Sequence, residues 1–233
     1  MTRVSFTFYL IGATIIFIYL ILHLGFPSDE EKRAQEKKEV LITVKSTFAN
    51  HWSRITELRA TWLKGKDIVL VTDADDRNLV KSLEDVELFV SPCKSGYTRW
   101  FCHFDDDNYV NVRVLKEMLS ALNDSVSSDI GRPSTKKKVT VRYEDQEVNF
   151  WFATGGAGFC LSSATVAILM KLQKENNVEI VSVSERTQLP DDMTLAFILY
   201  HYANITLTRD DRFHSHIERM RAFNHLNIRG QVL

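Results

Sequence analysis

Three consecutive carboxylates follow an apolar run in the middle of this chain. Residues 98–104 are mostly aromatic or apolar and predict a buried β-strand, which leads directly into Asp105, Asp106 and Asp107. Neighbouring like charges repel one another and resist burial. A helical pattern begins soon afterwards, over 112–123. The segment therefore predicts a strand that ends at the edge of a sheet, where the acids meet either a positive partner or solvent.

Two interpretations of these acids remain open from the residues alone. Oxygen ligands suit Mg²⁺ and Mn²⁺, so a divalent cation is one candidate partner. The alternative is a solvated turn in which the last acids cap the helix over 112–123 and favour its dipole. An EF-hand loop is excluded, because its sixth and twelfth positions would fall on Val110 and Lys116 instead of glycine and glutamate.

Predicted strands and helices alternate along the rest of the chain. The strands are expected at 40–45, 67–73, 86–90, 98–104, 139–143, 179–184 and 205–208, and the helices at 52–64, 112–123, 163–173 and 190–203. We expect Trp52 and Trp62 in the core and Ser163 as a helix N-cap. The alternation predicts an α/β domain with a mainly parallel sheet. Its carboxyl edge would gather Asp73 with the acids at 105–107.

The N-terminal segment predicts a membrane anchor. Residues 4–26 contain no Asp, Glu, Lys or Arg. At about 1.5 Å per residue they are long enough to cross a hydrocarbon core of roughly 30 Å. We therefore predict a short cytoplasmic tail over 1–3, an uncleaved signal anchor over 4–26, a charged stem over 27–39 and one globular domain over 40–233.

Charge and cysteine content restrict the function further. The formal net charge of −1 over 233 residues gives no basic footprint, so we expect no nucleic-acid partner. In an oxidising compartment Cys102 and Cys160 would bridge neighbouring strands and leave Cys93 over, whereas in the cytosol all three would be thiols. Asn123 and Asn204 begin tripeptides that accept N-linked glycans.

Glycine, histidine and acidic residues provide further site candidates. In the run Thr154-Gly-Gly-Ala-Gly we expect the strand to continue, so Gly155 and Gly156 either let a ligand approach the backbone or form a bulge required for packing. His214 and His216, in a polar loop, are either simply exposed or supply one imidazole nitrogen that would complete a mixed oxygen and nitrogen site suited to Mn²⁺. Asp191 and Asp192 are either ordinary first-turn acids or a general base at a helix start.

Taken together, these segments resemble the Fringe family of β-1,3-N-acetylglucosaminyltransferases. The matching motifs are Trp100-Phe-Cys-His-Phe-Asp-Asp-Asp-Asn-Tyr-Val-Asn, Phe150-Trp-Phe-Ala-Thr-Gly-Gly-Ala-Gly-Phe-Cys, Glu185-Arg-Thr-Gln-Leu-Pro-Asp-Asp and Phe213-His-Ser-His. The resemblance implies a GT-A fold, UDP-N-acetylglucosamine as donor, and O-fucose on EGF-like repeats of Notch-type receptors as acceptor. It also implies a single-pass type II protein of the Golgi membrane with a lumenal catalytic domain.

The resemblance also implies a role for each candidate residue. Asp107 and His214 would hold Mn²⁺, and Asp192 would be the base, with Asp191 as the second choice. The expected donor-binding residues are Lys45, Asp73, Asp105, Asp106, Gly155 and Gly156, and the expected disulfide joins Cys102 to Cys160. The chain is shorter than the family between Asp73 and Trp100. A Golgi protein that only binds glycoproteins, and a related β-1,3-galactosyltransferase, are the competing interpretations.

Overall fold

The computed structural model describes residues 38–64, 68–73, 98–215, 218 and 228–233. The predicted anchor over 4–26, the predicted strand over 86–90 and Cys93 lie outside these residues. Among the helices that are described, none combines the length and the apolar character that a membrane crossing requires.

A mixed six-stranded sheet forms the centre of the molecule. Its spatial order is β2-β1-β3-β7-β4-β8. The strands are β1 (Lys38–Lys45), β2 (Ile68–Val71), β3 (Thr98–Asp105), β4 (Asp129–Gly131), β7 (Phe159–Ser162) and β8 (Leu207–Arg209). Strand β1 pairs in parallel with β2 and β3, and β4 pairs in parallel with β8, whereas β7 runs antiparallel to both of its neighbours. The predicted α/β architecture with a mainly parallel sheet is therefore confirmed.

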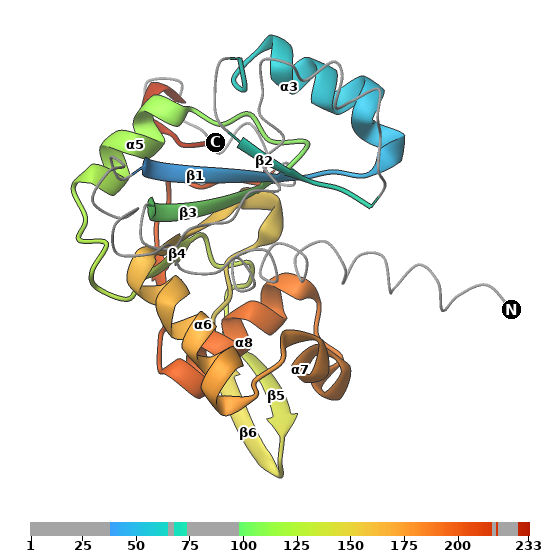
Figure 1. The fold of residues 1–233 in the computed structure, drawn as a ribbon, viewed down its shortest axis with the longest axis vertical. Coiled ribbons are helices and arrows are strands. Elements are labelled where there is room, and N and C mark those ends of the chain that lie inside the picture. Colours follow the sequence, from blue (N-terminus) through green and yellow to red (C-terminus); the bar gives the residue numbers. More distant parts are fainter. Residues whose placement is uncertain (1–37, 65–67, 74–97, 216–217, 219–227) are drawn as a thin grey trace, which may run out of the picture.

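Helices cover both faces of this sheet (Figure 1). Helices α3 (Thr56–Ala60) and α5 (Val112–Ser120) lie on one face, and α6 (Ser163–Asn176), α7 (Ile180–Thr187) and α8 (Asp191–Ala203) lie on the other. Successive strand side chains point to opposite faces, so β1 and β3 supply both hydrophobic cores. Ile42 and Cys102 belong to the core beside α5, while Leu41 and Phe101 pack with the core beside α6 and α8.

The segment after β1 differs from the predicted amphipathic helix over 52–64. It consists of a 3₁₀ turn, η1 (Phe48–Asn50), a π-helical turn, η2 (His51–Ile55), and the short α3. Trp62 is buried as expected, and its indole N–H donates to the Asn108 carbonyl at 2.9 Å. The prediction for Trp52 was wrong. Its side chain is 68% exposed, because the change in helical pitch turns it away from the sheet.

Two predicted helix starts also need correction. The Asn111 side chain, and none of the three acids, caps α5 by accepting the Val114 N–H at 3.3 Å. This finding removes the interpretation of Asp107 as a helix cap. Helix α5 ends at Ser120, so Leu122 is 40% exposed instead of lying on the buried face. The N-cap of α6 is Ser162, one residue before the predicted Ser163.

Other differences occur around short or β-branched segments. The predicted strand over 179–184 is helix α7, whose Val183 packs into the core beside α8. The predicted edge strand over 139–143 is β5 (Val139–Tyr143), which pairs with β6 (Gln146–Phe150) in a separate hairpin. The glycine run does not continue a strand. It forms the turn η3 (Gly155–Ala157), and β7 starts only after Gly158, whose φ of 70° suits glycine.

Candidate active site

The alternation of side chains at the end of β3 separates the acids onto two faces of the sheet. Asp105 lies opposite Lys45 in the β1–β3 register, two positions after the pair formed by Thr43 and His103. These four side chains share the face that α8 covers. Asp106 lies on the other face, towards η1 and η2. Two polar groups result, which we call the Lys45 cluster (Lys45, Asp105, Asp191 and Asp192) and the Asp106 cluster (Ser46, Asn50, Arg54, Asp106 and Asp107).

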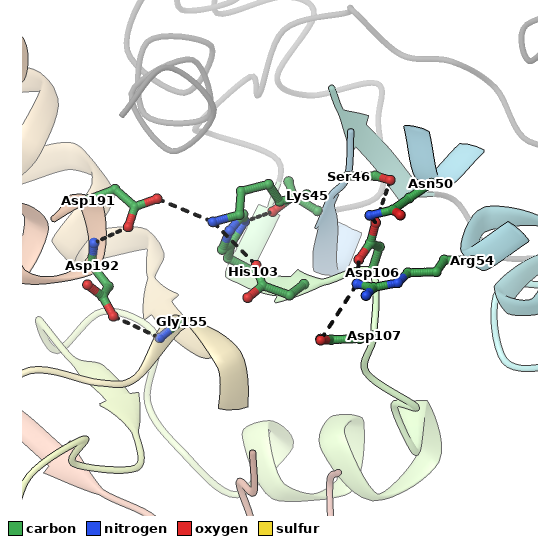
Figure 2. Close-up of polar contacts among 12 residues, drawn as sticks. Lys45, Ser46, Asn50, Arg54, His103, Asp106, Asp107, Gly155, Asp191 and Asp192 are labelled. Atoms are coloured by element: carbon green, nitrogen blue, oxygen red, sulfur yellow. Dashed lines mark hydrogen bonds and ion pairs between the residues drawn. The ribbon is translucent and has the colours of Figure 1, made fainter. Parts of the chain in front are cut away.

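Lys45 connects the sheet edge to the start of α8 (Figure 2). Its Nζ lies 3.3 Å from Asp191 Oδ2 and 3.5 Å from Asp105 Oδ1. Burial alone would lower the pKa of Lys45, but the two carboxylates together raise it above its ordinary value. Burial raises the pKa of Asp105, and Lys45 opposes that shift. One ammonium group therefore balances acids from two elements that are far apart in the sequence.

Asp192 occupies a different environment from its neighbour Asp191. Its Oδ2 accepts the Gly155 backbone N–H at 3.1 Å, and its Oδ1 accepts the Met193 N–H at 2.8 Å. Burial raises the pKa of Asp192, although these two hydrogen bonds act in the opposite direction. A partly buried carboxylate with a raised pKa, held by backbone donors on a rigid helix, is suited to accept a proton.

Asp106 is the most enclosed of the three consecutive acids. Its side chain is 6% exposed and accepts from Ser46 Oγ at 2.6 Å, Asn50 Nδ2 at 3.0 Å and Arg54 Nη1 at 2.6 Å. Arg54 also lies 3.7 Å from Asp107 Oδ2. Ser46, Asn50 and Arg54 were not predicted from the sequence. The spacing of Asn50 and Arg54, which places both on one side of a helical turn, was the available signal.

Asp73 is joined to the same segment. Its Oδ1 accepts the Phe48 backbone N–H at 2.8 Å. Beside it, Thr72 Oγ1 lies 2.6 Å from His51 Nε2. Residues 46–54 thus contact the ends of both β2 and β3, which brings the predicted nucleotide residue Asp73 and the acids at 105–107 to one edge of the sheet.

His214 lies in the loop after β8, with protein partners at both ring nitrogens. Its Nδ1 is 3.2 Å from Arg132 Nη1 and 3.2 Å from Glu218 Oε2, and its Nε2 is 2.9 Å from Gln231 Oε1. Within the described residues, no group of three or more His, Cys, Asp or Glu side chains is arranged to hold a metal ion.

The predicted covalent features lie on β3, β7 and the surface. Cys102 and Cys160 are opposite each other in the β3–β7 register and form the expected disulfide. Asn123 and Asn204 are exposed, which leaves both predicted glycan acceptors accessible. Gly155 was predicted to bind the sugar nucleotide. Its backbone N–H donates to Asp192, so it lies beside the candidate base.

The sheet order and its acidic carboxyl edge fit a GT-A-like α/β fold, the class that includes nucleotide-sugar glycosyltransferases. A family model described as Fringe-like matches residues 87–233, and the chain belongs to this family.

Curated relatives include the β-1,3-N-acetylglucosaminyltransferase radical fringe of Gallus gallus, which is 32% identical over 91% of this chain and 63% of the relative. The Fringe glycosyltransferase of Drosophila melanogaster is 32% identical over 84% of this chain and 54% of the relative. The lunatic fringe β-1,3-N-acetylglucosaminyltransferase of Mus musculus is 33% identical over 84% of this chain and 58% of the relative. The chain thus spans less than two thirds of the length of these relatives.

Proposed function

We propose that this chain transfers N-acetylglucosamine from UDP-N-acetylglucosamine to the 3-hydroxyl of O-linked fucose on EGF-like repeats of Notch-type receptors, with inversion at the sugar. The observation that carries the proposal is the Lys45 cluster, which joins an acidic strand end to a partly buried carboxylate at the start of α8. The names of the curated relatives support the sugar and the linkage. A type II location in the Golgi membrane, through the segment 4–26, belongs to the same proposal.

Asp192 is the better candidate for the base. Asp191 Oδ2 forms an ion pair with Lys45, and its Oδ1 accepts the Asp192 backbone N–H at 2.8 Å. Both oxygens of Asp191 therefore have a cationic or N–H partner, one of them the Lys45 ammonium group. Asp192 accepts the backbone N–H groups of Gly155 and Met193, and burial raises its pKa. A carboxylate whose pKa is raised above its ordinary value binds a proton more readily.

In the proposed reaction, the fucose 3-hydroxyl oxygen forms a bond to the sugar C1 while the bond from C1 to the UDP oxygen breaks. The hydroxyl proton moves to the Asp192 carboxylate, and the electron pair of the broken bond leaves with UDP. Attack from the side opposite to UDP inverts the anomeric centre. The Gly155 N–H orients the Asp192 carboxylate for this transfer, and Lys45 fixes α8 relative to the sheet edge.

The proposed cofactor is Mn²⁺, with Asp107 and His214 as its protein ligands. The donor types fit this ion, because a carboxylate oxygen and an imidazole nitrogen are both acceptable to it. Asp107 is 30% exposed, unlike the enclosed Asp106, so it is accessible to an ion and to phosphate oxygens. Once bound, the ion would neutralise charge on the departing diphosphate. Arg54, 3.7 Å from Asp107, supplies positive charge at the same position.

Transfer and binding measurements on the purified full chain would test the proposal. UDP-N-acetylglucosamine is titrated by calorimetry with and without Mn²⁺, and transfer to an O-fucosylated EGF-like repeat is followed by mass spectrometry. We expect Asp192→Asn to abolish transfer and retain donor binding, while Asp107→Ala loses the Mn²⁺-dependent part of donor binding. Asp191→Asn is the matched control on the same helical turn, and its transfer should exceed that of Asp192→Asn.

Other outcomes would favour the competing functions. Equal binding and transfer of UDP-galactose would indicate a β-1,3-galactosyltransferase, which shares the acidic cluster and the glycine segment. An absence of both transfer and Mn²⁺-dependent donor binding would indicate a protein that binds glycoproteins without modifying them. Equal loss of donor binding in the Asp107 and Asp192 variants would contradict the division of roles between the two faces of the sheet.

A further inference from the structure

His103 is a fully enclosed imidazole next to the Lys45 cluster, and the proposed reaction does not use it. Its side chain is 1% exposed. In the parallel β1–β3 register it lies opposite Thr43, and the next pair on the same face is Lys45 with Asp105. On its other side it lies opposite Phe159 of β7, with ring centroids 5.4 Å apart. Figure 2 shows the imidazole beside the Lys45 side chain.

The two contacts of the Thr43 hydroxyl bear on which nitrogen of this ring carries the proton. Thr43 Oγ1 donates to the Cys102 carbonyl at 3.3 Å and lies 2.9 Å from His103 Nδ1. A hydroxyl has one hydrogen to donate, so when Thr43 donates to the carbonyl its oxygen is left to accept from the ring. This arrangement favours a proton on Nδ1 of His103, with hydrogen bonds that run from the ring through Thr43 to the backbone of β3.

The surroundings also oppose a second proton on the ring. Burial, followed by the positive charge of Lys45, lowers the pKa of His103 to about 3, while the Asp191 carboxylate acts in the opposite direction. The charged groups that face the ring are Lys45 from β1, Asp105 from β3 and Asp191 from α8, whereas β7 contributes the apolar Phe159. A charged imidazole would compete with Lys45 for these two carboxylates.

We propose that His103 is a positioning residue, a neutral imidazole protonated on Nδ1 that packs beneath the Lys45–Asp105 pair and keeps Lys45 directed to Asp191. The functional part of this inference rests on the proposed function, because it requires that α8 carries the base. Its structural part, the protonation and tautomer of the ring, does not. His103 would act on the reaction through Lys45 and Asp191, without contacting the sugar.

The structural part is tested by NMR of the full chain labelled with ¹⁵N-histidine. The sequence has seven histidines, so the His103→Asn variant identifies the signals that belong to position 103. We expect these signals to show one neutral tautomer with the proton on Nδ1, unchanged between about pH 5 and pH 8, where an ordinary histidine titrates. A ring that titrates in this window, or that carries its proton on Nε2, would overturn the proposal.

The functional part is tested by a matched pair of variants at Thr43. Thr43→Val keeps the shape but removes the oxygen that accepts from the ring, whereas Thr43→Ser keeps that oxygen. We expect Thr43→Val to lower kcat about tenfold with little change in the KM for the donor, because the loss affects orientation and not donor binding. Thr43→Ser should retain most of the activity.

The outcomes separate this inference from the proposed function. Equal kcat values for Thr43→Val and Thr43→Ser would reduce His103 to a core residue without influence on the reaction. A KM increase without a change in kcat would place the effect on donor binding and also contradict the positioning role. If the wild-type chain transfers no sugar, the proposed function fails, and the NMR experiment still decides the tautomer.

Discussion

The disulfide between Cys102 and Cys160 should contribute a large part of the stability of this domain. The two residues are 58 positions apart in the sequence and join β3 to β7 three residues before Asp105. Closing a loop of this length in the unfolded chain corresponds to about 4 kcal/mol of stability in the chain-entropy model. We therefore predict that the Cys102→Ala, Cys160→Ala double variant loses about 4 kcal/mol of unfolding free energy.

Guanidinium unfolding of the full chain, followed by tryptophan fluorescence, measures this loss. Trp100 is a suitable reporter because it is 1% exposed and lies two residues before Cys102. The matched control is Cys93→Ala, which removes a cysteine and keeps the disulfide. Treatment of the wild-type chain with a reductant should reproduce the effect of the double variant. A double variant within about 1 kcal/mol of the Cys93→Ala control would refute the loop-closure argument.

Three further predictions follow from single positions. Asp192 has a pKa above the ordinary value of 3.8, and once protonated its carboxyl group cannot act as a base. We therefore expect kcat/KM to fall as the pH decreases through this raised pKa, which a pH–rate profile of the transferase measures. Gly158→Ala should destabilise the fold by about 3 kcal/mol or more in chemical denaturation, because its Cβ would overlap the Phe104 ring at a positive φ, whereas the control Gly230→Ala meets no atom within 4 Å. Asn111→Ala should cost about 1 kcal/mol by the same assay, since it removes the cap of α5.

The strand that carries the acids could be predicted because its apolar run and the charges that end it stand out in the sequence. Residues 98–104 are apolar and end abruptly in charge, and β3 has the expected position. The start of α8 was also predictable, since Pro190 precedes acids that favour a helix start. From these two elements alone, an acidic sheet edge near the pair Asp191 and Asp192 could be inferred.

The strand predicted at 179–184 failed for a physical reason. β-branched residues favour strands when only local preference is considered. In the fold, Val183 packs on the core beside α8 while Val181 is exposed, an arrangement that a helix provides. Tertiary packing thus outweighed the local preference. Strand β4 was missed because Asp-Ile-Gly is too short to show alternation, and it is defined by pairing with β7 and β8.

The partners of the acids were the least predictable part of the site. Asp106 was expected beside the sugar nucleotide. In the structure its carboxylate accepts hydrogen bonds from three side chains within residues 46–54. These contacts depend on the π-helical turn at His51–Ile55, which replaces the first part of the regular helix that was predicted over 52–64. Likewise, the ion pair between Lys45 and Asp191 joins residues 146 positions apart. Such a pair requires knowledge of which helix covers which face of the sheet.

The opposite orientation of Asp105 and Asp106 limits how the length of this strand can change. A single residue inserted or deleted between His103 and Asp105 would exchange the two acids, leaving the carboxylate near α8 facing Arg54 and the other facing Lys45. Loops on either side can lengthen or shorten without this exchange. A change in length within the last three residues of this strand should therefore disrupt the site, whereas a change in the loops outside the strands leaves this register intact.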